Sequence, residues 1–340
     1  MTMKANFTHF PLTFKRPAGT SRGVMNIKNS WILSLEKDSI VGKGEISIIE
    51  GLSAEFVDLK SFESTIQAFC EAVKKDDHDS IQTILTTNSS IRFAYECALA
   101  DLKNGGLGII FNNAFYSGKR KLPINGLIWM GSEDFMKEQI DAKLSEGFST
   151  IKMKVGAIDF EKELELLHSI RKNYSATEIT LRVDANGSFE PHQAVKVLEQ
   201  LAELEIHSIE QPIKAGQWNE MHKLCSSTPT PIALDEELIG ISDRKLKIEL
   251  LESIQPQYII LKPSLHGGIS GTQEWISLAE ERSIPWWMTS ALESNIGLSA
   301  ICQLTAEYSN ELPQGLGTGS LYTTNVENGL VVENGFIYRN

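Results

Sequence analysis

The spacing of hydrophobic and polar residues changes near residue 120, and the two patterns predict different architectures. Before that point, the segments 10–14, 31–35 and 45–49 are rich in aliphatic and aromatic residues, are separated by turn signals, and predict antiparallel strands. A helical repeat of hydrophobic residues follows over 62–103. Together these elements predict a small α+β domain over residues 1–120.

After residue 120, short hydrophobic segments alternate regularly with amphipathic helical patterns, as in βαβ units. The predicted strands are 124–130, 150–155, 179–183, 208–210, 232–234, 258–261, 286–289 and 314–316. The predicted helices between them include 134–145, 160–171, 192–204, 244–251, 271–282 and 298–308. Eight strands without a G-x-G-x-x-G motif after the first favour one closed barrel over an open doubly wound sheet. We predict a barrel over 121–322 and a strand-like tail, 323–340, that packs back on the first domain.

Composition and charge narrow the class of protein. The 340 residues include 32 Lys and Arg against 44 Asp and Glu, a formal net charge of −12. This acidic balance argues against a nucleic-acid partner, and no hydrophobic run approaches the roughly 18 residues of a membrane-spanning helix. The N-terminal segment lacks the hydrophobic region of a secretory signal, and the four cysteines form no C-x-x-C pair. We expect a cytoplasmic protein without nucleic-acid or membrane partners; the sequence makes no prediction of oligomeric state.

Charged and amide residues follow five consecutive predicted barrel strands. In a (β/α)8 barrel the carboxyl ends of the strands carry the active site, so side chains there converge on one mouth. The residues are Lys152 and Lys154, Asp184 and Asn186, Glu210, Asp235 and Glu236, and Lys262. One charged strand end is typical of a solvated turn, but five in succession, each about one βα unit apart, indicate a site.

Three of these residues are carboxylates on successive strands: Asp184, Glu210 and Asp235. Three oxygen ligands suit Mg²⁺, and without a cation each negative charge would raise the pKa of the others. Lys152 and Lys154 have the two-residue spacing that places both ammonium groups on the inner face of a strand, and Lys262 approaches from the far side. A nearby cation lowers the pKa of a lysine, so this arrangement predicts proton abstraction from a small carboxylate substrate.

Five motifs closely resemble those of the enolase superfamily, in the branch that contains muconate lactonising enzyme: TIKMKVG (150–156), LRVDANGSF (181–189), IEQPI (209–213), ALDEEL (233–238) and ILKPSLHGG (260–268). The resemblance covers nearly the whole chain. It implies an α/β fold, with a modified (β/α)7β TIM-type barrel and an N-terminal α+β capping domain completed by the C-terminal tail. It also implies that the three carboxylates bind Mg²⁺, with Mn²⁺ as the alternative. Lys154 and Lys262 match the catalytic lysines, Lys152 their supporting lysine, and Asn186 and Glu236 the residues that orient them.

Four further motifs are similar, within that branch, to the o-succinylbenzoate synthase family of menaquinone biosynthesis: RPAGTSRG (16–23), KPSLHGGISG (262–271), TSALESNIG (289–297) and GLGTGSL (315–321). This resemblance implies a lyase that dehydrates 2-succinyl-6-hydroxy-2,4-cyclohexadiene-1-carboxylate via an enediolate. One alternative is an N-acylamino acid racemase or dipeptide epimerase of the same superfamily, although 315–325 lacks the acidic pair typical of dipeptide epimerases. The other alternative is a non-catalytic barrel scaffold, which the full set of carboxylates and lysines disfavours.

Several residues outside this set are candidates for substrate contacts. Ser264, Gly267 and Gly268 offer a hydroxyl and backbone N–H groups to the succinyl carboxylate, or else form an ordinary turn into a helix. Ser290 is a similar candidate, with a nearby helix cap as the alternative. Arg22, in the polar loop 16–23, is a candidate for a lid over the ligand, with a solvated surface arginine as the alternative.

Overall fold

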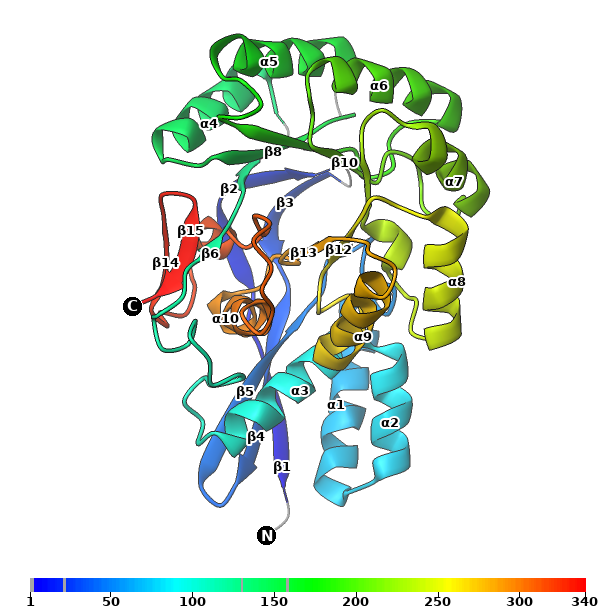
Figure 1. Ribbon diagram of the computed structural model, residues 1–340. Helices are drawn as coiled ribbons and strands as arrows, with labels where there is room; N and C mark the ends of the chain where they lie inside the picture. The colour runs from blue at the N-terminus through cyan, green and yellow to red at the C-terminus, as the bar shows by residue number, and fades with distance from the viewer. Residues whose placement is uncertain (1–2, 21–22, 130, 157–158) are drawn as a thin grey trace.

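The computed structural model describes residues 3–20, 23–129, 131–156 and 159–340, and Figure 1 shows two parts, an N-terminal cap and a parallel barrel. The elements of the cap's main sheet and helices are β1 (Lys4–His9), β4 (Ser30–Lys37), β5 (Ile40–Ser47), α1 (Leu59–Lys75), α2 (His78–Thr87) and α3 (Ser89–Lys103). The three strands form an antiparallel sheet in the order β1-β4-β5. In β4 the alternate residues Trp31, Leu33 and Leu35 are fully buried, because every second side chain of a strand faces the helices.

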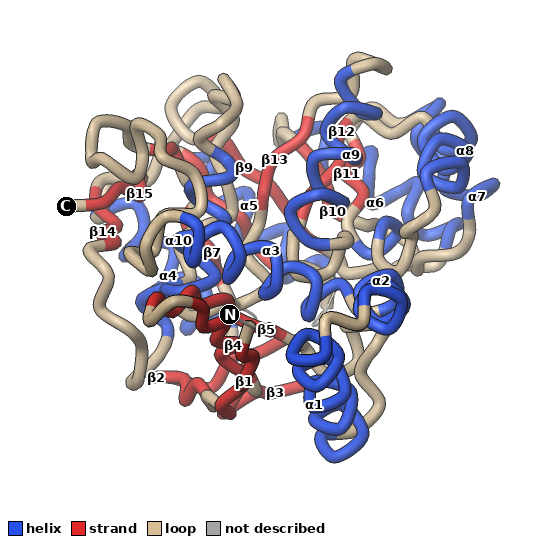
Figure 2. Tube along the Cα trace, turned by 90° about the horizontal axis from the view of Figure 1, so that it is seen from below, coloured by secondary structure: helices blue, strands red, loops and turns tan. Residues whose placement is uncertain are grey.

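The closest packing within the cap is between α3 and β5. A Cβ atom at Gly44 would lie 1.9 Å from the carbonyl oxygen of Ala94, so only glycine permits this approach. The backbone N–H of Lys43 also donates to Asp101 Oδ2 at 2.9 Å. Figure 2 shows α3 between the cap strands and the barrel. This helix therefore connects the two parts of the molecule.

Two further cap strands, β2 (Leu12–Thr20) and β3 (Gly23–Lys28), form a separate antiparallel hairpin. Their pairing shifts register between Thr13 and Ala18, and such a bulge accommodates Pro17, which cannot donate to a regular ladder. The predicted loop over 16–23 is therefore wrong for residues 16–20, which belong to β2. Arg22 lies outside the described residues.

Seven parallel strands form the barrel sheet, in the order β13-β12-β11-β10-β9-β8-β7. They are β7 (Gly126–Ile128), β8 (Thr150–Lys154), β9 (Thr180–Asp184), β10 (Ser208–Glu210), β11 (Ile232–Leu234), β12 (Tyr258–Leu261) and β13 (Trp286–Met288). The helices between and after them are α4 (Glu133–Ser145), α5 (Phe160–Asn173), α6 (Pro191–Glu203), α7 (Trp218–Ser227), α8 (Arg244–Ile254), α9 (Gly268–Glu280) and α10 (Asn295–Thr305). In Figure 1, α4 to α9 form an arc outside the strands, as the βαβ pattern predicts.

The sheet closes through a very short eighth segment, 314–315. Gln314 N–H donates to the carbonyl of Pro123 at 2.8 Å, on the β7 side. Gly315 N–H donates to the carbonyl of Met288 at 2.8 Å, on the β13 side. The predicted α/β barrel with an N-terminal capping domain is confirmed, and its eighth strand is reduced to these two residues.

The C-terminal tail contacts both parts of the molecule. Its hairpin, β14 (Leu330–Glu333) and β15 (Phe336–Arg339), pairs with β6 (Leu122–Pro123) beside the barrel. Thr323 N–H donates to the carbonyl of Thr13 in the cap hairpin at 2.9 Å. The domain boundaries at residues 120 and 322 stay predictions. Over the described ranges, the helices are too short or too polar for one to cross a bilayer.

Gly44→Ala should destabilise the protein by about 1–3 kcal/mol, because the added methyl group overlaps the α3 backbone. Urea unfolding followed by circular dichroism measures this loss. Lys43→Ala, at the neighbouring exposed position, is the control and should stay within about 0.5 kcal/mol of the parent. Equal stability of the two variants would show that α3 can move away from β5 without cost.

Candidate active site

Three neighbouring barrel strands bring a lysine and two carboxylates to the same level. Lys154 pairs with Asp184 across β8 and β9, and Asp184 pairs with Glu210 across β9 and β10. Asp184 and Glu210 are almost fully buried. Because strand partners on one face point in the same direction, all three side chains face the barrel interior.

The lysines of β8 are hydrogen-bonded to these carboxylates. Lys152 Nζ donates to Asp184 Oδ2 at 2.8 Å and also to Glu210 Oε2, so it bridges the two acids. Lys154 Nζ lies 2.5 Å from Asp184 Oδ2 and 2.7 Å from Asn186 Oδ1. The two lysines therefore share Asp184, as their period-two spacing predicts.

The opposite side of the site is built from the ends of β11 and β12. Lys262 Nζ donates to Asp235 Oδ2, and both side chains are buried. The backbone N–H of Lys262 donates to His266 Nδ1 at 2.9 Å, which fixes the turn after β12. Asn186 Nδ2 donates to Glu236 Oε1 at 2.8 Å and so links the two sides of the site.

Burial and charge act against each other at this centre. Burial raises the pKa of Asp184, but the ammonium groups of Lys152 and Lys154 outweigh it and hold that pKa well below its usual range. Burial and then the charge of Asp184 raise the pKa of Glu210 well above its usual range. Burial lowers the pKa of Lys262, but the charge of Asp235 outweighs it, and the net shift is upward. The centre therefore holds Lys262 protonated and carries more carboxylates than it can stabilise as anions.

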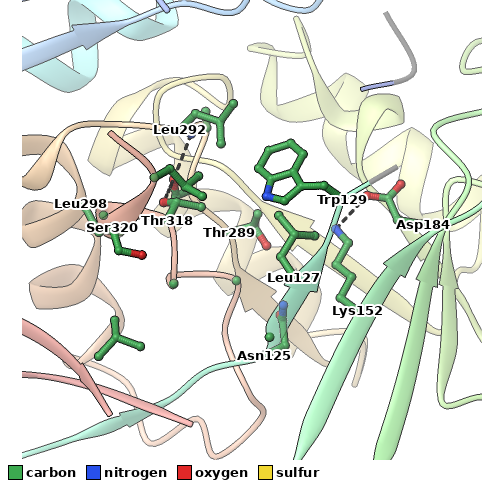
Figure 3. Close-up of a pocket in the computed structure, with 18 of the residues that line it drawn as sticks. Asn125, Leu127, Trp129, Lys152, Asp184, Thr289, Leu292, Leu298, Thr318 and Ser320 are labelled. Atoms are coloured by element: carbon green, nitrogen blue, oxygen red, sulfur yellow. Dashed lines mark hydrogen bonds and ion pairs between the residues drawn. The ribbon is translucent and has the colours of Figure 1, made fainter. Parts of the chain in front are cut away.

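These groups open into a cavity of about 690 Å³, a size typical of small-molecule sites. Charged and amide residues of the centre line it: Lys152, Lys154, Asp184, Asn186, Glu236 and Lys262. Figure 3 shows Lys152 bonded to Asp184 at one side of the cavity and Thr318, Ser320 and Leu298 at the other. Ser290, predicted as a substrate contact, also lines it, and its hydroxyl lies 2.7 Å from Thr318 Oγ1.

Residues 135–340, more than half of the chain, match the family described as enolase C-terminal domain-like. An o-succinylbenzoate synthase from Desulfotalea psychrophila is 45% identical over 98% of this chain and 98% of its own length. This chain belongs to the enolase superfamily. The predicted family is thereby confirmed.

Two solved enolase-superfamily structures have the same fold over the full chain. MenC from Desulfotalea psychrophila LSv54 has a TM-score of 0.87 at 40% identity and covers 99% of this chain and 100% of its own. A dipeptide epimerase from Enterococcus faecalis V583, complexed with Mg and the dipeptide L-Leu-L-Tyr, has a TM-score of 0.87 at 22% identity. That match covers 100% of this chain and 98% of the epimerase, and at this identity it bears on the fold alone.

The carboxylates of this enolase-superfamily site are of the residue types that bind metal ions, but in this structure they are not arranged around a common point. Within the described ranges, no three His, Cys, Asp or Glu side chains are arranged to hold an ion, and Lys152 instead bridges two of the acids. Glu210 Oε1 and Asp235 Oδ1 are nonetheless buried and receive no hydrogen bond from an N–H or hydroxyl group of any described residue. Two buried oxygens without donors, beside an acid whose pKa is raised by its neighbours, fit a divalent cation.

Three predicted substrate contacts are not supported. Ser264, Gly267 and Gly268 are not among the described residues that line the cavity. Ser264 Oγ donates instead to the buried Glu293 at 2.5 Å. The N-terminus of α9, which begins at the second of these glycines, receives a carboxylate of the cap, Glu96. The glycines therefore admit a protein side chain where we expected a ligand.

Most of the residues that line the cavity were missed by the sequence analysis as candidates for this enolase-superfamily site. Arg16 from β2, Asn125, Trp129 and Thr289 all line the cavity. Trp129 and Thr289 follow β7 and β13, so the strand-end rule used for the charged residues, applied to every residue type, would have found them. Arg16 reaches the cavity from the bulged part of β2, which the sequence does not reveal.

His266→Asn should reduce the loss of stability at mildly acidic pH. Burial lowers the pKa of folded His266 to about 3, whereas an unfolded histidine has a pKa of about 6.5. As the pH falls below the unfolded value, only the unfolded chain gains a proton, so the folded state loses about 2 kcal/mol between pH 7 and pH 5. Urea unfolding at both pH values measures this. The exposed His168→Asn is the control; an unchanged slope in His266→Asn would contradict the assignment.

Proposed function

We propose that the protein is an o-succinylbenzoate synthase, a lyase that dehydrates 2-succinyl-6-hydroxy-2,4-cyclohexadiene-1-carboxylate to o-succinylbenzoate in menaquinone biosynthesis. The observation that carries this proposal is the 45% identity to a synthase of that name over 98% of both chains. The lysines and carboxylates at the cavity support it, because they provide a base, a fixed positive charge and metal ligands together. We also infer a cytoplasmic location, since all four cysteines are buried and unpaired.

Asp184, Glu210 and Asp235 would hold Mg²⁺, or Mn²⁺ as the alternative. When bound, this cation supplies positive charge to the carboxylate oxygens of the substrate and so makes the adjacent C–H bond more acidic. The orphan oxygens of Glu210 and Asp235 support the assignment. Lys152, which bridges Asp184 and Glu210, would keep these two ligands together.

Lys154 is the proposed base, because it lines the cavity and is held by both Asp184 and Asn186. Its neutral amine takes the proton from the carbon next to the ring carboxylate, and the electron pair of that C–H bond moves onto the carboxylate as an enediolate. The ammonium of Lys154 then gives the proton to the leaving hydroxyl, the C–O bond breaks, and water departs as the ring becomes aromatic.

Lys262 is the proposed electrostatic partner of this reaction. It directly follows β12 and lines the cavity opposite Lys154, and its pair with Asp235 keeps it protonated. A fixed ammonium at this position stabilises the negative charge that develops on the substrate. Glu236 and Asn186, joined at 2.8 Å, position the two sides of the site relative to each other.

A racemase or epimerase of the same superfamily is the second candidate. Lysines on two sides of one cavity favour it, because such a pair can remove a proton from one face of a carbon and return it to the other. A free α-ammonium group would need an acidic partner, and the segment 315–321 contains none. N-acylated amino acids, which lack that ammonium group, are therefore the substrates by which to distinguish the two activities.

The purified protein with Mg²⁺ should convert the cyclohexadiene substrate to the aromatic product, and EDTA should abolish the reaction until excess Mg²⁺ is added. Ultraviolet absorbance follows the aromatic ring as it forms, and Mn²⁺ in place of Mg²⁺ tests the alternative metal. Racemisation of N-succinyl amino acids is measured in parallel by polarimetry. Efficient racemisation without dehydration would overturn the proposed function.

Lys154→Ala should lower kcat by roughly 100- to 10,000-fold, the usual contribution of a general acid–base group. Lys247→Ala is the control, because Lys247 is also buried and ion-paired, with Glu274 at 2.9 Å, but does not line the cavity. It should lower the melting temperature with little change in kcat. If Lys154→Ala keeps most of its activity while folded, another residue is the base.

A further inference from the structure

Two buried side chains of the cap strand β5 bond to the barrel beside the cavity: Ser47 to one cavity wall, and Glu45 to the start of the helix that follows this wall. This wall, residues 289–292, follows β13 and precedes α10, and each of its four residues lines the cavity. Ser47 Oγ donates to the carbonyl of Ala291 at 3.2 Å. Glu45 lies on the same strand and accepts hydrogen bonds from Ser294 and Gly297, at the start of α10.

Glu45 is fully buried and is satisfied from both parts of the molecule. It accepts hydrogen bonds from Ser294 N–H at 2.9 Å, at the N-cap of α10, and from Gly297 N–H at 3.1 Å, in the first turn of that helix. Ser30 Oγ of the cap donates to it at 2.8 Å. A Cβ atom at Gly297 would lie 3.0 Å from Glu45 Oε2, so glycine gives the carboxylate room. The start of α10 is thereby fixed to β5.

The wall needs such support because its backbone is strained. Leu292 has φ of +60°, a left-handed conformation that a non-glycine residue adopts only when its surroundings impose it. Tyr322 Oη donates to the carbonyl of Leu292 at 2.7 Å. The Leu292 side chain packs with Leu12 and Phe14 of β2. Cap and tail therefore hold the wall in a conformation that it would not adopt alone.

Glu96 provides an internal comparison. This cap residue bonds to the start of α9 as Glu45 bonds to the start of α10: Ile269 N–H donates to it at 2.5 Å and Ser270 N–H at 3.2 Å. A Cβ atom at Gly268 would lie 2.5 Å from Glu96 Oε2. Unlike the wall 289–292, however, Glu96 and the first turn of α9 are not among the described residues that line the cavity.

We propose that Glu45 and Ser47 are positioning residues that set the substrate affinity of the enzyme by fixing the cavity wall 289–292. The inference rests on the proposed function and adds to it a specificity determinant inside the cap core. The lysines of the reaction are held by Asp184 and Asp235, and Glu45 does not contact them. Loosening the wall therefore affects how the substrate is held and leaves the proton transfer intact.

Steady-state dehydration kinetics of Glu45→Gln, Ser47→Ala and Glu96→Gln test this inference. Glu45→Gln should raise KM by about tenfold with kcat within about twofold, because the amide cannot accept all the hydrogen bonds of the carboxylate. Ser47→Ala, a milder change that tests the wall if Glu45→Gln does not fold, should raise KM by about threefold. Glu96→Gln should lower the melting temperature but leave KM within about twofold.

Equal changes of KM in Glu45→Gln and Glu96→Gln would overturn the inference, because they would indicate a general loosening of the cap. An unchanged KM in both Glu45→Gln and Ser47→Ala, with an active parent enzyme, would overturn it while the proposed function stands. An inactive parent enzyme would overturn the proposed function and the inference with it.

Discussion

Ion pairing between buried lysines and carboxylates is the interaction on which this structure depends. A buried carboxylate without a cation costs several kcal/mol, so strands that carry acids into a barrel must lie beside strands that carry positive charge. The parallel register of β8, β9 and β10 meets this condition, because it sets Lys154, Asp184 and Glu210 side by side. The acids of the site are therefore kept in place by the same lysines that we propose for the chemistry.

The way the barrel closes determines the shape of the cavity. The closing segment is only two residues long, and a Cβ atom at Gly315 would lie 2.4 Å from Thr289 Oγ1, so this part of the wall has no side chain. The cavity continues from the charged centre to Leu330 and Ile337 of the C-terminal hairpin. Hydrophobic residues therefore line part of the cavity away from the lysines and carboxylates of the charged centre.

Regular parts of the fold could be predicted from the sequence, because they depend on local periodicity. Two-residue alternation and the repeat of strand and helix determine which residues end each barrel strand, and Asp184 and Lys154 were found in this way. α7 (Trp218–Ser227) was not among the predicted helices, although its buried residues Met221, Leu224 and Cys225 have helical spacing. Contacts between distant segments leave no such pattern: the sequence cannot reveal that Glu96 fills the turn at Gly267 and Gly268.

The cap is attached to the barrel at the N-termini of two helices, away from the residues that we propose for the reaction. The first N–H groups of a helix have no partner within the helix, and an acidic side chain satisfies them and the positive end of the helix dipole. Glu45 and Glu96 do this for α10 and α9, so the cap is fixed to the barrel without using any strand-end charge. Residues that hold the lysines then lie on rigid strands, whereas residues that shape the cavity wall lie where cap and barrel meet. Change in substrate among relatives of one barrel is expected at that junction, because it can move without disturbing the paired charges.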